Sequence, residues 1–279
     1  MFVLIISLLL SAASVAACNL SEAMRGWSTI IGIVVFLLAM YLIGRIVGKR
    51  VAVVQTALQE HMQKGQARIS RDIHQFQMKP HGNPKAMQMQ VEQKQQKLIK
   101  EALEMVEGFA PFQNWSLLMG RQMNTMKLQF HYQLKEYDKV DALLAKKGLL
   151  SKPMLMEPLA VSMKMARQYE TGDMKALEKT FKKRIRWMRG DRGTLLYALM
   201  SWAYVKKGQV DEARLLLAKG MEKTGNEVLA RNWELLANDK VKSFSNKGLG
   251  EEWYAIGLEA PPTPKAQRQR GNAKGQRRF

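Results

Sequence analysis

Apolar residues are concentrated at the start of the chain, in two runs that differ from everything downstream. The first run covers residues 2–17 and the second covers residues 27–48, and neither contains an aspartate or a glutamate. A helix needs about 20 apolar residues to cross the hydrocarbon core of a bilayer. The second run therefore predicts a transmembrane helix, which ends in a basic cluster of Arg45, Lys49 and Arg50.

The first apolar segment, residues 1–18, has two interpretations. As a transmembrane helix it forms a hairpin with the second run. As a signal sequence it is removed, because residues 14–18 are similar to the cleavage box of bacterial lipoproteins and make Cys18 a candidate lipidation site. No Lys or Arg precedes the run, which counts against a signal peptide. Both interpretations place the chain after residue 48 on the cytoplasmic side, in agreement with its basic cluster.

Downstream of these runs, apolar positions recur at helical spacing and no segment alternates convincingly with period two. Residues 51–107 predict a juxtamembrane stalk of two polar helices, separated at residues 79–84 by a break that contains two prolines. Residues 109–258 predict paired helices. Residues 261–279 hold six basic and no acidic residues, which predicts a disordered tail. The expected fold class is therefore all-α.

The best helix pair, residues 194–227, carries small and large residues in a fixed order around Gly208. The small residues are Ser201, Ala213 and Gly220, and the large ones are Tyr197, Tyr204 and Leu217. This order resembles the tetratricopeptide repeat, in which small residues let two helices approach and large ones fill the gaps. Similar turns occur at Gly172, 36 residues earlier (208 − 172), and at Lys135, 37 residues before that (172 − 135). The resemblance implies an α-solenoid of about three helix pairs, with a generic helical bundle as the alternative.

The resemblance also implies a binding surface, because tetratricopeptide repeats bind extended peptides on the face formed by their first helices. In this chain that face predicts a protein-binding groove lined by Tyr169, Ala198, Trp202, Val205 and Lys206. Within it, Trp202 is the expected apolar anchor and Lys206 the expected partner of a carboxylate. A Trp buried between repeats is the alternative interpretation.

Charge adds a second candidate surface. The chain holds 44 Lys and Arg against 24 Asp and Glu, a net charge of +20, which favours anionic lipid head groups, nucleic acid or acidic proteins as partners. The most basic helix, residues 173–189, predicts an anionic-partner patch made of Lys175, Lys179, Lys182, Lys183, Arg184, Arg186, Trp187 and Arg189. A solvated outer face is the alternative interpretation of this patch.

The sequence offers little chemistry. One cysteine and four histidines provide neither an internal disulfide nor a zinc-ligand spacing. No phosphate-binding loop, nucleophile elbow or paired-histidine motif occurs, so no cofactor, metal site or catalytic residue is predicted, and an enzyme is not expected. The functional hypothesis is a membrane-anchored adaptor that organises partner proteins at the cytoplasmic face of a bacterial inner membrane. The alternatives are a membrane-tethered nucleic-acid or ribosome binder that uses the basic helix and tail, and a periplasmic lipoprotein.

Overall fold

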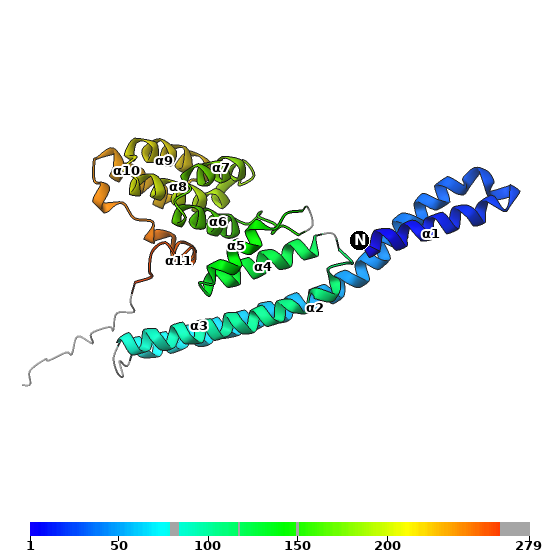
Figure 1. Ribbon diagram of the computed structural model, residues 1–279, viewed down its shortest axis with the longest axis horizontal. Coiled ribbons are helices and arrows are strands. Elements are labelled where there is room, and N and C mark those ends of the chain that lie inside the picture. The colour runs from blue at the N-terminus through cyan, green and yellow to red at the C-terminus, as the bar shows by residue number, and fades with distance from the viewer. Residues whose placement is uncertain (79–83, 117, 149–150, 263–279) are drawn as a thin grey trace, which may run out of the picture.

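A computed structural model describes residues 1–78, 84–116, 118–148 and 151–262. Every regular element in these ranges is a helix, which confirms the all-α fold class. Figure 1 shows a long N-terminal arm of helices and a group of shorter helices packed beside its middle and far end. Most of the predicted tail, from residue 263 onward, lies outside the described residues.

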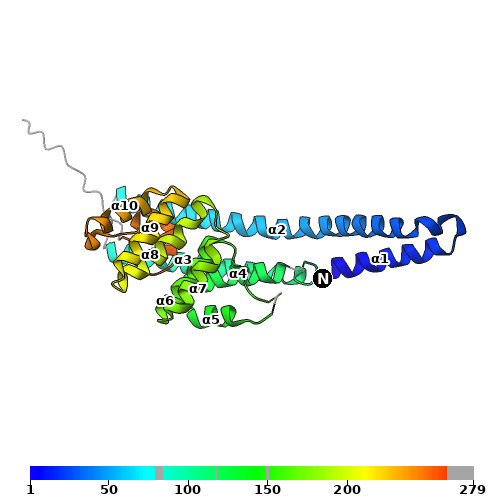
Figure 2. The same ribbon diagram turned by 90° about the horizontal axis from the view of Figure 1, so that it is seen from above.

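The arm begins with an antiparallel helical hairpin, in which α1 (Phe2–Asn19) and the start of α2 (Ser28–Met78) are joined by the 3₁₀ turn η1 (Glu22–Trp27) (Figure 2). Small residues allow the two helices to approach closely. The Ser11 hydroxyl donates to the backbone oxygen of Gly32 over 2.8 Å, and a side chain at Gly32 would collide with α1. Both helices are long and apolar enough to cross a membrane, yet only 6% and 11% of their most apolar windows are buried. The hairpin therefore leaves most of its apolar surface exposed.

The second helix does not end where its apolar run ends. The sequence predicted a transmembrane helix over residues 27–48 and a separate stalk helix after it, whereas α2 continues without a break to Met78. No proline occurs between residues 28 and 78, so the chain of i to i+4 hydrogen bonds is not interrupted. Helix α3 (Pro84–Glu107) returns along α2, and Leu98 lies directly against the backbone of Gly65. The stalk is thus a second antiparallel hairpin.

The remaining helices form a helical domain, in which α4 packs with α5, α6 with α7 and α8 with α9, and α10 then packs on α9. Their bounds are α4 (Met119–Gln133), α5 (Tyr137–Ala145), α6 (Pro158–Glu170), α7 (Met174–Ile185), α8 (Thr194–Lys206), α9 (Val210–Thr224), α10 (Glu227–Ala237) and α11 (Glu251–Ala255). Short 3₁₀ turns also occur at η2 (Ala110–Phe112), η3 (Gly190–Gly193), η4 (Val241–Ser243) and η5 (Lys247–Leu249).

The turns within the three helix pairs share one backbone geometry. Lys135, Gly172 and Gly208 are left-handed, with φ of 59°, 78° and 77°. In each turn the next amide donates to the carbonyl five residues before it over 2.9 Å, which closes the end of the first helix. These are the three positions predicted from the sequence. Asp239, with φ of 55°, makes a fourth turn of the same kind after α10, which the sequence pattern did not mark.

Two apolar cores hold the chain together. The larger core fills the helical domain, and in it Gly220 lies so close to the Tyr197 ring that a side chain there would force a shift. Ala213 and Leu217 of the same helix are fully buried. The second core joins the stalk to α4 and consists of Leu58, Ala102, Val106, Phe109, Met119 and Met123. The stalk therefore packs directly on the helical domain.

Candidate functional site

The residues predicted to line a protein-binding groove lie on α6 and α8, and the chain's own C-terminal segment, residues 251–259, contacts one of them, Trp202. Ala198 is fully buried and the Trp202 side chain is only 6% exposed. The Trp202 ring packs edge-on against Tyr169, with ring centres 5.0 Å apart, and against Trp253 of α11 at 6.0 Å. The expectation that Ala198 and Trp202 are open to a partner is therefore corrected, because both residues are buried and the Trp202 ring packs against Tyr169 and Trp253.

One carboxylate joins the C-terminal segment to α8. Trp202 Nε1 donates to Glu259 Oε1 and Trp253 Nε1 donates to Glu259 Oε2, each over 2.9 Å. An indole N–H can only donate, so the two oxygens of one carboxylate satisfy both rings. The Lys206 ammonium lies 5.3 Å from the centre of the Trp202 ring and is exposed, while Val205 is half-buried. Lys206 is the one member of the predicted groove that is fully exposed.

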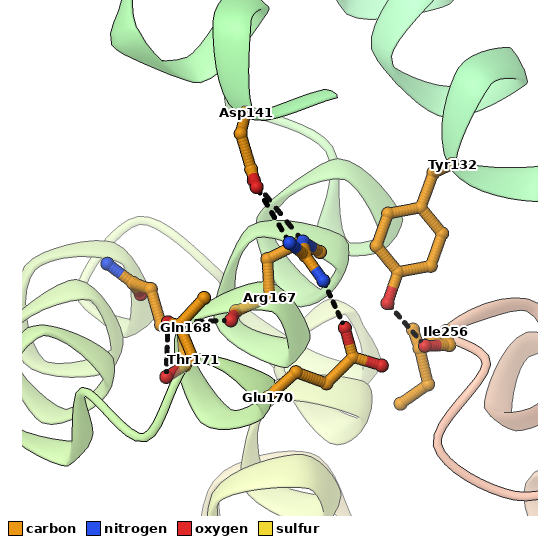
Figure 3. A network of polar contacts seen from close by, with 7 residues as sticks. All are labelled: Tyr132, Asp141, Arg167, Gln168, Glu170, Thr171 and Ile256. Atoms are coloured by element: carbon orange, nitrogen blue, oxygen red, sulfur yellow. Dashed lines mark hydrogen bonds and ion pairs between the residues drawn. The ribbon is translucent and has the colours of Figure 1, made fainter. Parts of the chain in front are cut away.

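A polar network ties the helix pairs to the same segment (Figure 3). Arg167 of α6 donates from Nε and Nη2 to the two carboxylate oxygens of Asp141 on α5, over 3.2 and 2.7 Å, and from Nη1 to Glu170 over 2.7 Å. The hydrogen bonds to Asp141 raise the pKa of Arg167, so its charge is permanent. The Tyr132 hydroxyl donates to the backbone oxygen of Ile256 over 2.6 Å. Local sequence patterns do not reveal these pairs, because they join residues 26 and 124 positions apart.

The predicted anionic-partner patch is open to solvent. Seven of its eight residues line one groove along α7 together with Glu178: Lys175, Lys179, Lys182, Lys183, Arg186, Trp187 and Arg189. The Trp187 ring is 75% exposed, so it is free to contact a partner. Arg184 does not line this groove; it is half-buried and lies close enough to Arg121 of α4 for the two charges to repel.

The start of the chain is tied to the segment before α4. The Met1 amino group and the Phe2 amide both donate to the backbone oxygen of Asn114, over 2.7 and 2.8 Å. The Phe2 ring meets Trp115 edge-on, with ring centres 5.6 Å apart. Cys18, the candidate lipidation site, lies half-buried in the last turn of α1. Cleavage before Cys18 would remove all the contacts of residues 1 and 2.

Comparison with known proteins adds no family. The chain matches no protein-family model, and no curated protein or solved structure matches it significantly. In the part of the chain that the structure describes, no three His, Cys, Asp or Glu side chains form a group able to hold a metal ion. The two surfaces and the hairpin are therefore the features that bear on function.

Proposed function

We propose that this protein is an integral membrane adaptor. Its N-terminal hairpin spans a bacterial inner membrane, and its helical domain, a solenoid of tetratricopeptide-like helix pairs, is held at the cytoplasmic face. There the α7 groove binds an acidic surface of a partner protein. The observation that carries the proposal is the packed hairpin, whose N-terminus is fixed to the domain through Asn114.

The outer surface of the hairpin supports insertion. Its inner positions are small, such as Ser7 and Ala39, which are buried between the helices, whereas Leu8 and Ile33 are largely exposed. Helices in lipid associate through small residues and place large apolar ones toward the lipid. The basic cluster that follows the second apolar run supports a cytoplasmic domain, since positive residues are retained on that side.

The contacts of Met1 and Phe2 favour an uncleaved hairpin over a signal sequence. If residues 1–17 were removed, Asn114 and Trp115 would lose their partners and α2 would lose the helix that packs on Gly32. A periplasmic lipoprotein requires that removal, so it is the weaker alternative.

The α7 groove supports an acidic partner. Exposed Arg and Trp side chains dominate the energetics of protein interfaces, and a groove of one charge sign speeds association with the opposite sign. The exposed Trp187 ring also favours a second candidate function, nucleic-acid binding, because bases stack on aromatic rings that are flanked by cations.

Insertion and topology are tested on the full chain. It should stay in the membrane fraction after carbonate washing, and mass spectrometry should find Met1 retained and Cys18 unmodified. With Cys18→Ser, a new cysteine at the exposed Gln209 should react with a membrane-impermeant maleimide only after permeabilisation. Extraction by carbonate, or an acylated N-terminal Cys18, would overturn the hairpin.

The partner surface is tested by charge reversal. In cell cross-linking followed by mass spectrometry, Lys179→Glu, Lys182→Glu and Arg186→Glu together should remove an acidic protein that the wild type captures. The matched control reverses three exposed cations on α9 and α10, namely Lys219, Lys223 and Arg231. Nucleic acid that co-purifies at low salt and is lost in about 0.5 M salt would support the second function instead.

A further inference from the structure

A second group of cations, distinct from the α7 groove apart from Lys183, forms where separate elements meet. We call it the basic end, and it consists of Arg121 on α4, Lys146 after α5, Lys152, Lys164 on α6, and Lys183 and Arg184 on α7. No short motif contains these residues, because they come from four different parts of the chain. Lys146, Lys152 and Lys183 are exposed, and the other three are half-buried.

Hydrogen bonds fix the geometry of this group. Arg121 Nε donates to the backbone oxygen of Lys152 over 3.3 Å, and Lys146 Nζ donates to Asn124 Oδ1 over 3.2 Å. Asn124 in turn donates from Nδ2 to the backbone oxygen of Ser151 over 2.8 Å. These bonds hold Ser151 and Lys152 against the first half of α4, so that Lys146 and Lys152 lie near Arg121.

In the part of the chain that the structure describes, no carboxylate forms an ion pair with the basic end. Among the described residues, none of its six members lies within 4.0 Å of a carboxylate. Burial, followed by repulsion from Arg184, Lys183 and Lys152, lowers the pKa of Lys164. Arg121 also lies in the first turn of α4, where the helix dipole disfavours a cation. The folded chain thus holds mutually repelling cations close together. An anion bound among them would offset the free energy of this repulsion.

The position of the basic end identifies the anion. Figures 1 and 2 both place the start of α4 and the segment before α6 on the side of the helical domain nearest the N-terminus. Asn114, which holds the Met1 amino group, is only seven residues before Arg121. If the hairpin spans the bilayer, Met1 lies at the cytoplasmic boundary, and the basic end faces the head groups there.

We propose that the basic end binds anionic phospholipid head groups of the bilayer that the hairpin spans, and that this contact holds the helical domain against the membrane surface. The proposal rests on the proposed membrane insertion. Phospholipid phosphates are favoured over a nucleic acid, because the bond from Met1 to Asn114 places the cations beside a surface that is always present. The binding leaves most of the α7 groove free for a partner.

The test is hydrogen exchange on the full chain in lipid nanodiscs, made either of phosphatidylcholine alone or of phosphatidylcholine with phosphatidylglycerol. Amides of residues 151–156 and of the first turn of α4 should exchange at least about fivefold more slowly with phosphatidylglycerol, since one cation near an anionic leaflet already changes the equilibrium by that factor. The triple variant Arg121→Gln, Lys164→Gln and Arg184→Gln should lose this slowing. The triple variant Lys219→Gln, Lys223→Gln and Arg231→Gln removes the same charge elsewhere and should keep it.

The outcomes separate this inference from the function on which it rests. Equal exchange in the two lipids by a chain that resists carbonate extraction overturns lipid binding and leaves insertion intact. Equal loss in both triple variants shows a general charge effect and also overturns it. A chain that carbonate extracts overturns the proposed insertion and this inference with it.

Protection by an oligonucleotide in neutral nanodiscs, without protection by phosphatidylglycerol, identifies nucleic acid as the occupant instead. The first triple variant should melt at about the same temperature as the wild type in neutral lipid, because the repulsion that it removes offsets the exposed Arg121 hydrogen bond that it also loses. A large loss of stability would contradict the unpaired state of these cations.

Discussion

Replacement of Trp253 by alanine tests whether the C-terminal segment is a fixed part of the helical domain or a removable occupant of its groove. The Trp253 side chain is fully buried, and its ring packs on Trp202. Truncation of a buried Trp to Ala costs about 3–5 kcal/mol, the sum of lost burial and the cavity left behind. For a domain of this size each kcal/mol lowers the melting temperature by about 2–4 °C, so Trp253→Ala should lower it by roughly 6–20 °C.

A subtler change separates the hydrogen bonds from the packing. Glu259→Gln keeps the size of the side chain but replaces one carboxylate oxygen, a hydrogen-bond acceptor, with an NH₂ group, which is a donor. One of the two indole N–H groups then faces another donor, at a cost of about 1–3 kcal/mol. The expected fall in melting temperature is therefore a few degrees, clearly smaller than that of Trp253→Ala.

The assay is thermal unfolding of the full chain in detergent, followed by near-ultraviolet circular dichroism. Trp187→Ala is the matched control, because that ring is 75% exposed and its removal should change stability by less than about 0.5 kcal/mol. A Trp253→Ala variant that melts with the control would refute the reasoning. The segment would then be a loosely held occupant, and Trp202 would again be available to a partner.

Three further predictions concern other parts of the chain. Ala213→Phe should destabilise the helical domain by about 1–3 kcal/mol in the same melts, because Ala213 is fully buried between α8 and α9. Glu136→Gln should reduce the loss of unfolding free energy as the pH is lowered in the acid range. A hydrogen bond from His131 lowers the pKa of Glu136. The Glu136 carboxylate therefore stabilises the fold above about pH 4.5 and loses that effect as the pH falls through its lowered pKa. Gly32→Leu should separate the two helices of the hairpin, because Val15 occupies the space, and proteolysis of the released α1 in nanodiscs should increase.

Local patterns were sufficient to predict the helical elements of the domain and the turns within its three helix pairs. Residues at Lys135, Gly172 and Gly208 recur at intervals of 37 and 36, and each adopts the left-handed conformation that ends one helix before the next begins. Most of the break predicted at residues 79–84 lies outside the described residues, and Pro84, its last residue, begins α3. The continuity of α2 was not predicted, since a change from apolar to polar residues marks a change of surroundings rather than the end of a helix.

The arrangement of the surfaces could not be predicted from local patterns. Glu259 is 57 residues from Trp202, and no spacing rule links a carboxylate in an irregular segment to an indole on a distant helix. The basic end is similar, because Arg121 and Arg184 belong to different helix pairs and come close only in the folded domain. The α7 groove was predictable for the opposite reason: Lys175, Lys179, Lys182 and Lys183 lie on consecutive turns of one helix, so the helical period places them together. The helix predicted over residues 173–189 ends at Ile185, and the remaining basic residues of the groove and Trp187 follow directly in the chain.

If the hairpin spans a membrane as proposed, the length of the stalk places the helical domain beside that membrane rather than far from it. From residue 49 to residue 78, α2 rises by about 45 Å, and α3, with 24 residues, returns by about 36 Å. Gly108 consequently lies against Val54, only six residues beyond the last apolar residue of the second run. Along the axis of α2, the chain therefore enters α4 close to the point where the apolar hairpin of α1 and α2 ends. The second core, which joins the stalk to α4, fixes that position. A stalk shortened equally on α2 and α3 should leave the distance between the basic end and the apolar hairpin unchanged. Residues inserted in α3 alone should instead shift the register of this core and move α4 along α2, relative to the apolar hairpin.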